Sequence, residues 1–426
     1  MLNFNSEVFK YKNNNLFCEN LEVNTIAKQT GTPAYIYSKK YFIDRYSEFS
    51  NAFREIKHRI FFSAKSNYNL NVIRIFSQCG SGIDVNSGGE LFRAVQAGVN
   101  PKDIIQTGVG KTDEEIKYGI EQGVKLMKTE SFDEICLIDK IAGKLQRKIE
   151  IALRVNPDVD AETHPYISTG LSENKFGVSS GDAVKIYKVA SRLKNISLTG
   201  IDMHIGSLVT TVSPYLEAVD KLSEIFFKVR DIGINLKHFD IGGGMGVNYN
   251  DGTSLNIKEL AELLIPKFKK LNCEIWFEPG RYLTANGGIL ITKVLFNKQN
   301  GNKNFIIVDA GMNDLIRPSI YGSYHHIQPV VKNESRKEIT ADIVGPVCES
   351  GDFLAKDRNI SEIKPGEYLA VMSAGAYGMT MSSNYNARRR PPEVIVDRDK
   401  FYITRGRENF EHLLFDEKIV EELHKR

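Results

Sequence analysis

Residues 82–108, GIDVNSGGELFRAVQAGVNPKDIIQTG, show most clearly the repeating pattern that decides the fold. The apolar run GIDVN is typical of a short strand, and GELFRAVQAGV has apolar residues at the i, i+3 and i+4 spacing of a helix. Ser87 and Glu90 have the spacing of a capping box, which places the start of the helix directly after the strand. Because the apolar run DIIQTG follows, this stretch predicts a strand, a helix and another strand.

The same pattern continues in both directions, from about residue 59 to residue 281. The predicted strands are RIFFSAK (59–65), GIDVN (82–86), DIIQTG (103–108), KLMKTE (125–130), EIALRVN (150–156), LTGIDMHI (198–205), HFDIGGG (238–244) and EIWFEPGR (274–281). Amphipathic helical patterns lie between them, and this repetition is typical of a (β/α)8 TIM barrel, which has about 250 residues. A doubly wound open parallel sheet has the same elements and is the competing topology.

The pattern changes after residue 283. Short runs such as NFIIVDAG and EYLAVMSAG are strand-like and are separated by turn residues, which predicts a second, all-β domain of sandwich-like or barrel-like form. Strand-like pieces near the N-terminus are expected to join it, so the predicted domains are a barrel of residues 36–282 and a β-domain of residues 1–35 plus 283–426. The last segment, ENFEHLLFDEKIVEELHKR (408–426), is predicted to be an amphipathic helix.

The composition is that of an ordinary globular protein, with 426 residues of which 42% are hydrophobic and 26% charged. Fifty-six basic and 53 acidic residues leave a net charge of +3, which argues against a nucleic-acid-binding surface. The five cysteines are scattered and form no CxxC pair, so we expect neither a disulfide framework nor a metal site. The sequence has no signal-peptide pattern and no apolar run of bilayer length, so we expect a cytoplasmic protein that does not bind membranes.

In a (β/α)8 barrel the active site lies at the C-terminal ends of the strands, so the residues found there are candidates for chemistry. Most of the predicted strands end in ionisable groups or glycines: Lys65, Asp84, Arg154, His204, residues 242–244, Glu278 and Arg281. Lys65 follows the apolar run IFFSA. Its side chain either extends to solvent, as most lysines do, or lies in an apolar site that frees the amine to attack an aldehyde.

The glycine run after the seventh predicted strand, IGGGMG (241–246), is a candidate phosphate site. Glycines let backbone N–H groups approach a phosphate closely, and the loops after strands 7 and 8 often bind phosphate in this fold. The run does not match a dinucleotide fingerprint, because Val247 stands where the third glycine is needed. A flexible turn without a ligand is the alternative interpretation.

A nucleophilic lysine together with a phosphate-binding loop, and without a nucleotide motif, points to pyridoxal 5'-phosphate (PLP) as the cofactor. Glu278, in a turn with Pro279 and Gly280, is then a candidate partner for the pyridine nitrogen, because a carboxylate there keeps the ring protonated. His204 either stacks on the face of the ring or is a hydrogen-bonded core histidine.

A series of motifs in order along residues 30–410 resembles bacterial diaminopimelate decarboxylases: FSAKSN, IDVNSGGE, HPYISTGLSENKFG, HIGS, GGGMG, EPGR, RPSIYGSYH, CESGD and GAYGMTMSSNYN. The resemblance implies a fold-type III PLP enzyme, in which a barrel and a β-domain built from both chain ends work as a homodimer with shared active sites. It also implies removal of one carboxylate from meso-2,6-diaminopimelate, which gives L-lysine and CO2 in the last step of lysine biosynthesis.

The resemblance further implies a role for each matching residue. The catalytic residues would be Lys65, His204 and Cys348. The residues that bind PLP would be Lys65, Asp84, His204, Ser207, Gly243, Gly244, Glu278, Pro279, Gly280, Arg281 and Tyr377. The residues that bind substrate would be Arg281, Arg317, Tyr321, Glu349 and Tyr377. Of these, Cys348 and Glu349 would reach into the active site of the other subunit.

Other activities remain as alternatives. A decarboxylase for ornithine, arginine or a carboxylated polyamine shares the chemistry, but Glu349 and Arg317 favour a substrate with a second carboxylate. The presence of the whole set of site residues disfavours a non-catalytic PLP-binding homologue. An alanine-racemase-like enzyme would have an arginine rather than Glu278 at the pyridine nitrogen. Residues 158–175 are either a lid over the substrate or a solvated insertion.

Overall fold

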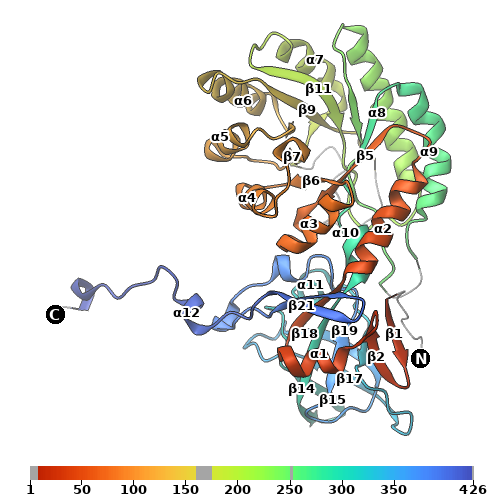
Figure 1. Ribbon diagram of the computed structural model, residues 1–426, viewed down its shortest axis with the longest axis vertical. Helices are drawn as coiled ribbons and strands as arrows, with labels where there is room; N and C mark the ends of the chain where they lie inside the picture. The colour runs from red at the N-terminus through yellow and green to blue at the C-terminus, as the bar shows by residue number, and fades with distance from the viewer. Residues whose placement is uncertain (1–7, 160–174, 250–252, 425–426) are drawn as a thin grey trace. The chain divides into compact units, whose positions relative to one another are not determined.

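The computed structural model describes residues 8–159, 175–249 and 253–424 (Figure 1). The chain divides into two compact units, one formed by residues 40–286 and the other by residues 1–39 together with 287–426. We call the first the barrel unit and the second the β unit.

The barrel unit contains, in its described residues, a closed barrel of eight parallel strands. In order around the barrel they are β5 (His58–Ser63), β6 (Gly82–Val85), β7 (Ile104–Gln106), β8 (Leu126–Thr129), β9 (Ile149–Asn156), β11 (Ile196–Asp202), β12 (His238–Asp240) and β13 (Glu274–Phe277). Parallel pairing of β8 with β9 and of β13 with β5 closes the circle. The prediction of a barrel is therefore confirmed, and the open sheet is excluded because its edge strands would be unpaired.

Helices follow the barrel strands and bury an apolar face against them. The longer ones are α2 (Lys39–Ala52), α3 (Leu70–Gln78), α4 (Gly88–Gln96), α5 (Asp113–Gln122), α6 (Phe132–Lys144), α7 (Ser180–Ala190), α8 (Ser213–Asp231) and α9 (Ile257–Leu271). Shorter elements are η1 (Ala64–Ser66), η2 (Pro101–Asp103), β10 (Val178–Ser179), α10 (Arg281–Thr284) and η4 (Ala285–Gly287). Within the described ranges of both units, no helix is long and apolar enough to cross a membrane.

Three of these helices begin at a capping hydroxyl, one of them at Ser87 as the sequence predicts. Thr112 caps α5 in a complete capping box, because its hydroxyl accepts the Glu115 N–H at 3.2 Å and the Glu115 carboxylate accepts the Thr112 N–H at 3.1 Å. Ser87 and Ser131 cap α4 and α6 through their hydroxyls in the same way. In these two helices the glutamate three positions after the capping serine accepts the N–H of the residue before that serine. Each glutamate therefore joins the start of its helix to the end of the preceding strand.

The β unit is built mainly of sheet. Its larger sheet contains β4 (Ala34–Ser38), β14 (Gly288–Asn300), β15 (Lys303–Val308), β16 (Ile327–Pro329), β17 (Glu338–Val344), β18 (Phe353–Ser361), β19 (Tyr368–Val371), β20 (Glu393–Asp397) and β21 (Lys400–Arg405). A smaller sheet contains β1 (Phe9–Lys12), β2 (Asn15–Cys18) and β3 (Leu21–Glu22). The helical elements are α1 (Val23–Thr30), α11 (Arg317–Tyr321), η5 (Met379–Met381), η6 (Tyr385–Ala387), α12 (Phe410–Leu413) and η7 (Glu421–His424). Because β4 pairs with both β14 and β20, the two ends of the chain share one sheet.

The prediction of one amphipathic helix over residues 408–426 is wrong. The described residues of this segment form only α12 and η7, with non-helical chain between them (Figure 1). Five apolar side chains of the segment are between 64% and 78% exposed: Phe410, Leu414, Phe415, Ile419 and Leu423. An amphipathic helix owes most of its stability to burial of its apolar face, and these side chains have no such burial.

Candidate active site

The interior of the barrel changes from apolar to polar within one step along the strands. A buried apolar cluster fills the middle: Phe61, Ile105, Leu126, Ala152 and Trp276. Side chains two positions apart on a strand point to the same side. Two positions further along four of these strands come Ser63, Lys128, Arg154 and Glu278. We call these four residues the polar layer. It lies next to the apolar cluster, towards the C-terminal ends of the strands.

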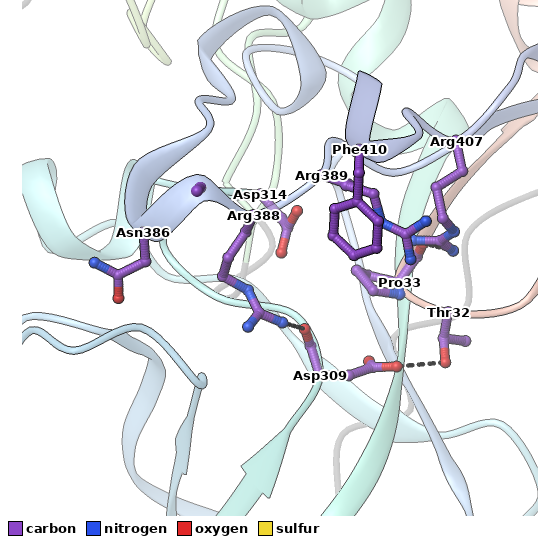
Figure 2. A pocket seen from close by; sticks show the side chains of 10 residues that line it. Thr32, Pro33, Asp309, Asp314, Asn386, Arg388, Arg389, Arg407 and Phe410 are labelled. Atoms are coloured by element: carbon purple, nitrogen blue, oxygen red, sulfur yellow. Dashed lines mark hydrogen bonds between the residues drawn. The ribbon is translucent and has the colours of Figure 1, made fainter. Parts of the chain in front are cut away.

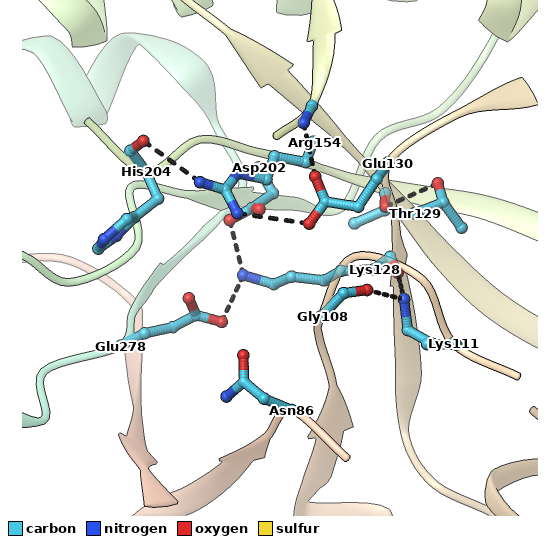
Figure 3. Close-up of polar contacts among 12 residues, drawn as sticks. Asn86, Gly108, Lys111, Lys128, Thr129, Glu130, Arg154, Asp202, His204 and Glu278 are labelled. Atoms are coloured by element: carbon cyan, nitrogen blue, oxygen red, sulfur yellow. Dashed lines mark hydrogen bonds and ion pairs between the residues drawn. The ribbon is translucent and has the colours of Figure 1, made fainter. Parts of the chain in front are cut away.

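Lys128, on β8, lies at the centre of a buried cluster of carboxylates (Figure 3). Its ammonium nitrogen Nζ donates to Asp202 Oδ1 at 2.6 Å and to Asp240 Oδ2 at 2.7 Å, and it also contacts Glu278 Oε1. The three acids come from the ends of β11, β12 and β13, so barrel closure brings them to Lys128. Their oxygens lie within 4.8 Å of one another, and the Lys128 ammonium is the cation that they surround.

Burial and mutual repulsion shift the ionisation of these groups. Burial raises the pKa of Asp202 to about 7, although Lys128 opposes this shift. Burial and the Asp84 carboxylate raise the pKa of Glu278 well above its usual range, and Lys128 again opposes the shift. Burial acts to lower the pKa of Lys128, but the surrounding carboxylates outweigh it and raise the pKa well above its usual value. Lys128 is therefore a permanent positive charge in the cluster.

Asp84, on β6, has one carboxylate oxygen that is satisfied and one that is not. Its Oδ2 accepts a hydrogen bond from the Ser63 hydroxyl at 2.7 Å. Its buried Oδ1 accepts none from the residues that the structure describes. A buried acceptor without a partner is unfavourable, so this atom marks a position where a donor from a ligand would be stabilising.

Lys65 lies just beyond the end of β5, in the short helix η1. The predicted strand over residues 59–65 is therefore two residues too long at its C-terminal end, since β5 ends at Ser63. Lys65 is partly exposed, which agrees with a side chain that extends towards solvent. Its charge nevertheless acts on His204. Burial first and the Lys65 charge second lower the pKa of His204 well below its usual value.

His204 follows β11 and is held in one tautomer. Its Nδ1 accepts a hydrogen bond from the Gly243 N–H at 3.2 Å, so this nitrogen carries no proton. The lowered pKa agrees with a neutral ring. His204 is therefore an uncharged imidazole with its proton on Nε2, and the glycine run after β12 fixes its orientation.

The glycine run brings backbone, not side chains, next to His204 and Glu278. A Cβ at Gly243 would lie 2.3 Å from the carbonyl oxygen of Glu278. A Cβ at Gly244, whose φ is +93°, would lie 2.3 Å from the carbonyl oxygen of Gly206. Only glycine fits at both positions, because neighbouring backbone leaves no room for a side chain.

Arg281 brings a charge and two hydroxyl groups to the same end of the barrel. It is the first residue of α10, and its guanidinium donates to Ser207 Oγ and to the Tyr249 hydroxyl, each at 2.9 Å. A guanidinium beside hydroxyl and backbone N–H groups suits a phosphate, because it supplies charge-assisted hydrogen bonds.

The other predicted site residues belong to the β unit, and Arg317 and Tyr321 share the short helix α11. Arg317 is 2% exposed. Its Nη1 contacts His325 Nε2 at 2.8 Å and its Nη2 donates to Ser323 Oγ at 3.3 Å. These two contacts hold the guanidinium in place.

Cys348 and Glu349 are exposed in the turn between β17 and β18. The Cys348 N–H donates to Asn386 Oδ1 at 2.7 Å. Tyr377, after β19, is partly exposed and has a left-handed backbone with φ of +55°. These residues lie in loops, where a fold can vary a site without changing its sheet.

In the described part of the chain, a cavity of about 340 Å³ in the β unit has none of the predicted site residues in its wall, although Asn386, which accepts the Cys348 N–H, lines it (Figure 2). Three arginines and two aspartates line it: Arg388, Arg389, Arg407, Asp309 and Asp314. Asp309 accepts the Thr32 hydroxyl at 2.6 Å through its carboxylate, and its carbonyl oxygen accepts Arg388 at 3.3 Å. Arg388 therefore contacts a backbone carbonyl here, and the Asp309 carboxylate contacts a hydroxyl.

Sequence reasoning missed Lys128, Asp202 and Asp240. A signal was present, because Lys128 stands two positions after Leu126 in a predicted strand and therefore shares the inward face of that strand. A lysine on an inward face needs buried counter-charges. Asp202 and Asp240, which lie within two other predicted strands, were the candidates.

Residues 39–285 match the family model described as pyridoxal-dependent decarboxylase, pyridoxal binding domain. The diaminopimelate decarboxylase of Aquifex aeolicus is 45% identical to the chain, over 95% of this chain and 96% of its own. That of Haemophilus influenzae is 46% identical, over 95% and 98%. The chain belongs to the diaminopimelate decarboxylase family.

Solved structures of diaminopimelate decarboxylases share the fold. The one from Helicobacter pylori, complexed with L-lysine, has a TM-score of 0.89 and 38% identity and covers 92% of this chain and 98% of its own. The one from M. jannaschii, in co-complex with L-lysine, has a TM-score of 0.93 and 33% identity and covers 98% and 99%. The fold-type III assignment is thereby confirmed.

Members of the diaminopimelate decarboxylase family are PLP enzymes, and the barrel unit of this chain fits that cofactor. Lys65 supplies an amine and Glu278 a carboxylate. Gly243 and Gly244 lie where a Cβ would fill the space beside the backbone, and Asp84 Oδ1 is an acceptor with room for a donor. Bound there, PLP supplies an electron sink that stabilises a carbanion. The motif over residues 164–177 and most of the predicted lid lie outside the described residues.

Proposed function

We propose that this PLP-dependent decarboxylase removes the carboxylate at the D-configured end of meso-2,6-diaminopimelate and releases L-lysine and CO2. The observation that carries the proposal is that Lys65, His204 and Glu278 lie at the same end of the barrel. The chain that forms this barrel matches diaminopimelate decarboxylases over almost its whole length. The L-lysine in the two related structures is the product that this reaction would leave.

Each barrel residue has a part in holding the cofactor. Lys65 binds it through its amine, and the Glu278 carboxylate pairs with the ring nitrogen. His204, as a neutral imidazole, lies against the ring, and Asp84 accepts a hydrogen bond near Glu278. The phosphate lies among the backbone and side-chain donors of Ser207, Gly243, Gly244, Gly280 and Arg281, with Pro279 in contact in the same turn, and Tyr377 completes the cofactor contacts. The close backbone approach at Gly243 and the contact between Arg281 and Ser207 support this arrangement.

The substrate is recognised by its distal carboxylate. Arg281, Arg317, Tyr321 and Tyr377 bind that end, and Glu349 faces the distal ammonium. A substrate such as ornithine lacks the carboxylate and would leave buried cations unmatched, which can reduce turnover by several orders of magnitude. After loss of CO2, Cys348 or Lys65 returns a proton to the same carbon.

Lysine release by the holoenzyme tests the reaction directly. We expect release from meso-diaminopimelate and far slower turnover of ornithine and arginine. The variant Lys65→Ala should lose both the activity and the visible absorption band of the bound cofactor. Lys57→Ala, at an exposed lysine paired with Glu274, serves as control and should keep both. Faster turnover of ornithine or arginine would overturn the substrate, and a band that persists in Lys65→Ala would overturn the role of Lys65.

We also propose that the protein works as a homodimer in which Cys348 and Glu349 complete the active site of the other subunit. Two observations support this proposal. Cys348 and Glu349 are exposed rather than buried in their own β unit. The apolar side chains from Phe410 to Leu423 are also exposed, and exposed apolar groups of this size are typical of a surface that another chain covers.

A cytoplasmic location completes the proposal. All five cysteines are free: Cys18, Cys79, Cys136, Cys273 and Cys348. Free cysteines are typical of proteins in reducing compartments. Recovery of the activity in the cytoplasmic fraction of lysed cells would test this location, and recovery elsewhere would contradict it.

A further inference from the structure

Lys128 has no part in the reaction described above, although it is completely buried at the centre of the polar layer. We propose that Lys128 is a positioning residue for Glu278, whose carboxylate it orients and whose charged form it favours, so that the acid can pair with the ring nitrogen of PLP. This inference rests on the role proposed for Glu278.

A closed ring of contacts joins Lys128 to Glu278 by two routes. Directly, the Lys128 ammonium contacts Glu278 Oε1. Indirectly, Lys128 donates to Asp240 Oδ2 at 2.7 Å, and Asp240 Oδ1 accepts the Gly242 N–H at 2.8 Å. The Gly242 carbonyl oxygen in turn accepts the Glu278 N–H at 2.7 Å. Lys128 therefore holds both the side chain of Glu278 and, through Asp240, the loop that fixes its backbone.

The same circle of contacts also reaches His204, the residue proposed to lie against the pyridine ring of PLP. Gly243, which follows Gly242, donates its N–H to His204 Nδ1 at 3.2 Å. A movement of the glycine run would thus disturb His204 and Glu278 together. Lys128 stabilises this run through the carboxylate of Asp240.

The charges around Glu278 give Lys128 a second effect. Asp84, Asp202 and Asp240 are acidic and act to protonate Glu278, as does its burial. Arg154, the other cation of this layer, donates to Glu130 Oε1 at 3.3 Å and to the His204 carbonyl oxygen at 3.5 Å. Lys128 is the cation in direct contact with Glu278 among the described ion pairs. Without it, no described cation in direct contact would oppose the burial and the three aspartates, and the charged form of Glu278, which favours a protonated ring nitrogen, would be less stable.

The test uses the holoenzyme of Lys128→Met, reconstituted with PLP labelled with 15N at the ring nitrogen. NMR of this nitrogen reports its protonation and does not require substrate. We expect protonation in Lys128→Met to be lost at a pH lower by about one unit than in the wild type, and PLP to dissociate about tenfold more readily, because one pKa unit corresponds to a tenfold change. Lys128→Gln, which keeps an N–H donor without the charge, should show the same loss if Lys128→Met does not fold.

The matched control is Lys111→Met. Lys111 is also a buried lysine of the barrel unit. It donates to Glu134 at 2.7 Å and to the Lys128 carbonyl oxygen at 2.6 Å, and none of its hydrogen bonds or ion pairs within the described residues involves Glu278. We expect it to lower the melting temperature while leaving ring protonation and PLP affinity unchanged. Equal shifts in ring protonation in Lys128→Met and Lys111→Met would overturn the proposal. An unchanged ring protonation in both Lys128→Met and Lys128→Gln would also overturn it.

A double-mutant cycle separates this proposal from a general effect on the fold. In a Glu278→Gln background, Lys128→Met should cause no further change in ring protonation or PLP affinity, since the group that Lys128 acts upon is absent. A further change of the same size would overturn the proposal. These readouts hold whichever amino acid the enzyme decarboxylates, so they can fail or succeed independently of the substrate assay.

Discussion

Asp314, which lines the cavity in the β unit, makes stability depend on pH. Its Oδ2 accepts the Gly311 N–H at 2.9 Å, and burial raises its pKa to about 7. In the unfolded chain the pKa of an aspartate is about 4. Between about pH 4 and pH 7 the folded protein therefore holds a proton that the unfolded chain has lost, and the contribution of Asp314 to stability falls as pH rises through this window.

The variant Asp314→Asn keeps an acceptor for Gly311 and cannot ionise. We expect its melting temperature to rise relative to that of the wild type as pH increases from about 4 to about 7, and the difference to level off above about pH 7. Thermal unfolding of both proteins in steps across this range measures the effect. A difference that does not change with pH would contradict a raised pKa at Asp314.

For single residues, the sequence predicts the position along a strand better than it predicts which other residues will lie in contact. Lys65, His204 and Glu278 were candidates because each lies just beyond the end of a barrel strand, and the ends of barrel strands meet. The importance of Lys128 depends on three carboxylates from strands far away in the sequence. Lys128 alone therefore looks like any other lysine in a strand.

Among the elements, α5 has the most complete helix start, and its cap should be measurable. Thr112→Ala removes the hydroxyl that accepts the Glu115 N–H and should lower the free energy of unfolding by about 1 kcal/mol, with no change in kcat or KM. Thr112→Ser keeps the hydroxyl and should stay close to the wild type. Chemical unfolding of the three proteins gives the comparison. Equal stability of Thr112→Ala and Thr112→Ser would show that the capping box contributes nothing.

The elements that the sequence predicted well are those with local signals. The barrel strands and the helices after them have apolar periodicity and capping residues within a few positions of each other, so their order could be read directly. The segment over residues 408–426 has the same periodicity, but Leu414 and Leu423 have no core against which to pack. Periodicity shows that a helix could bury an apolar face, and it does not show whether a surface is present to cover it.

For the whole molecule, the decisive question is whether one chain completes the active site of another. Mixing Lys65→Ala chains with Glu349→Ala chains should restore activity to about one quarter of the wild-type value. Random pairing of symmetric dimers gives half heterodimers, and each of these has one site with both residues intact. Mixing Lys65→Ala with His204→Ala is the matched control, since both residues belong to the barrel unit and no pairing can restore a site.

The two mixtures must be compared as heterodimers isolated with two different affinity tags, so that pairing itself is established. If Glu349 acts within its own chain, every heterodimer of Lys65→Ala and Glu349→Ala contains two damaged sites, and no activity returns. Recovery in this mixture together with none in the control would require that the exposed turn at Cys348 and Glu349 serves a barrel other than its own. The exposure of that turn would then follow from assembly, because a residue that completes a neighbour's site has to remain accessible in the isolated chain.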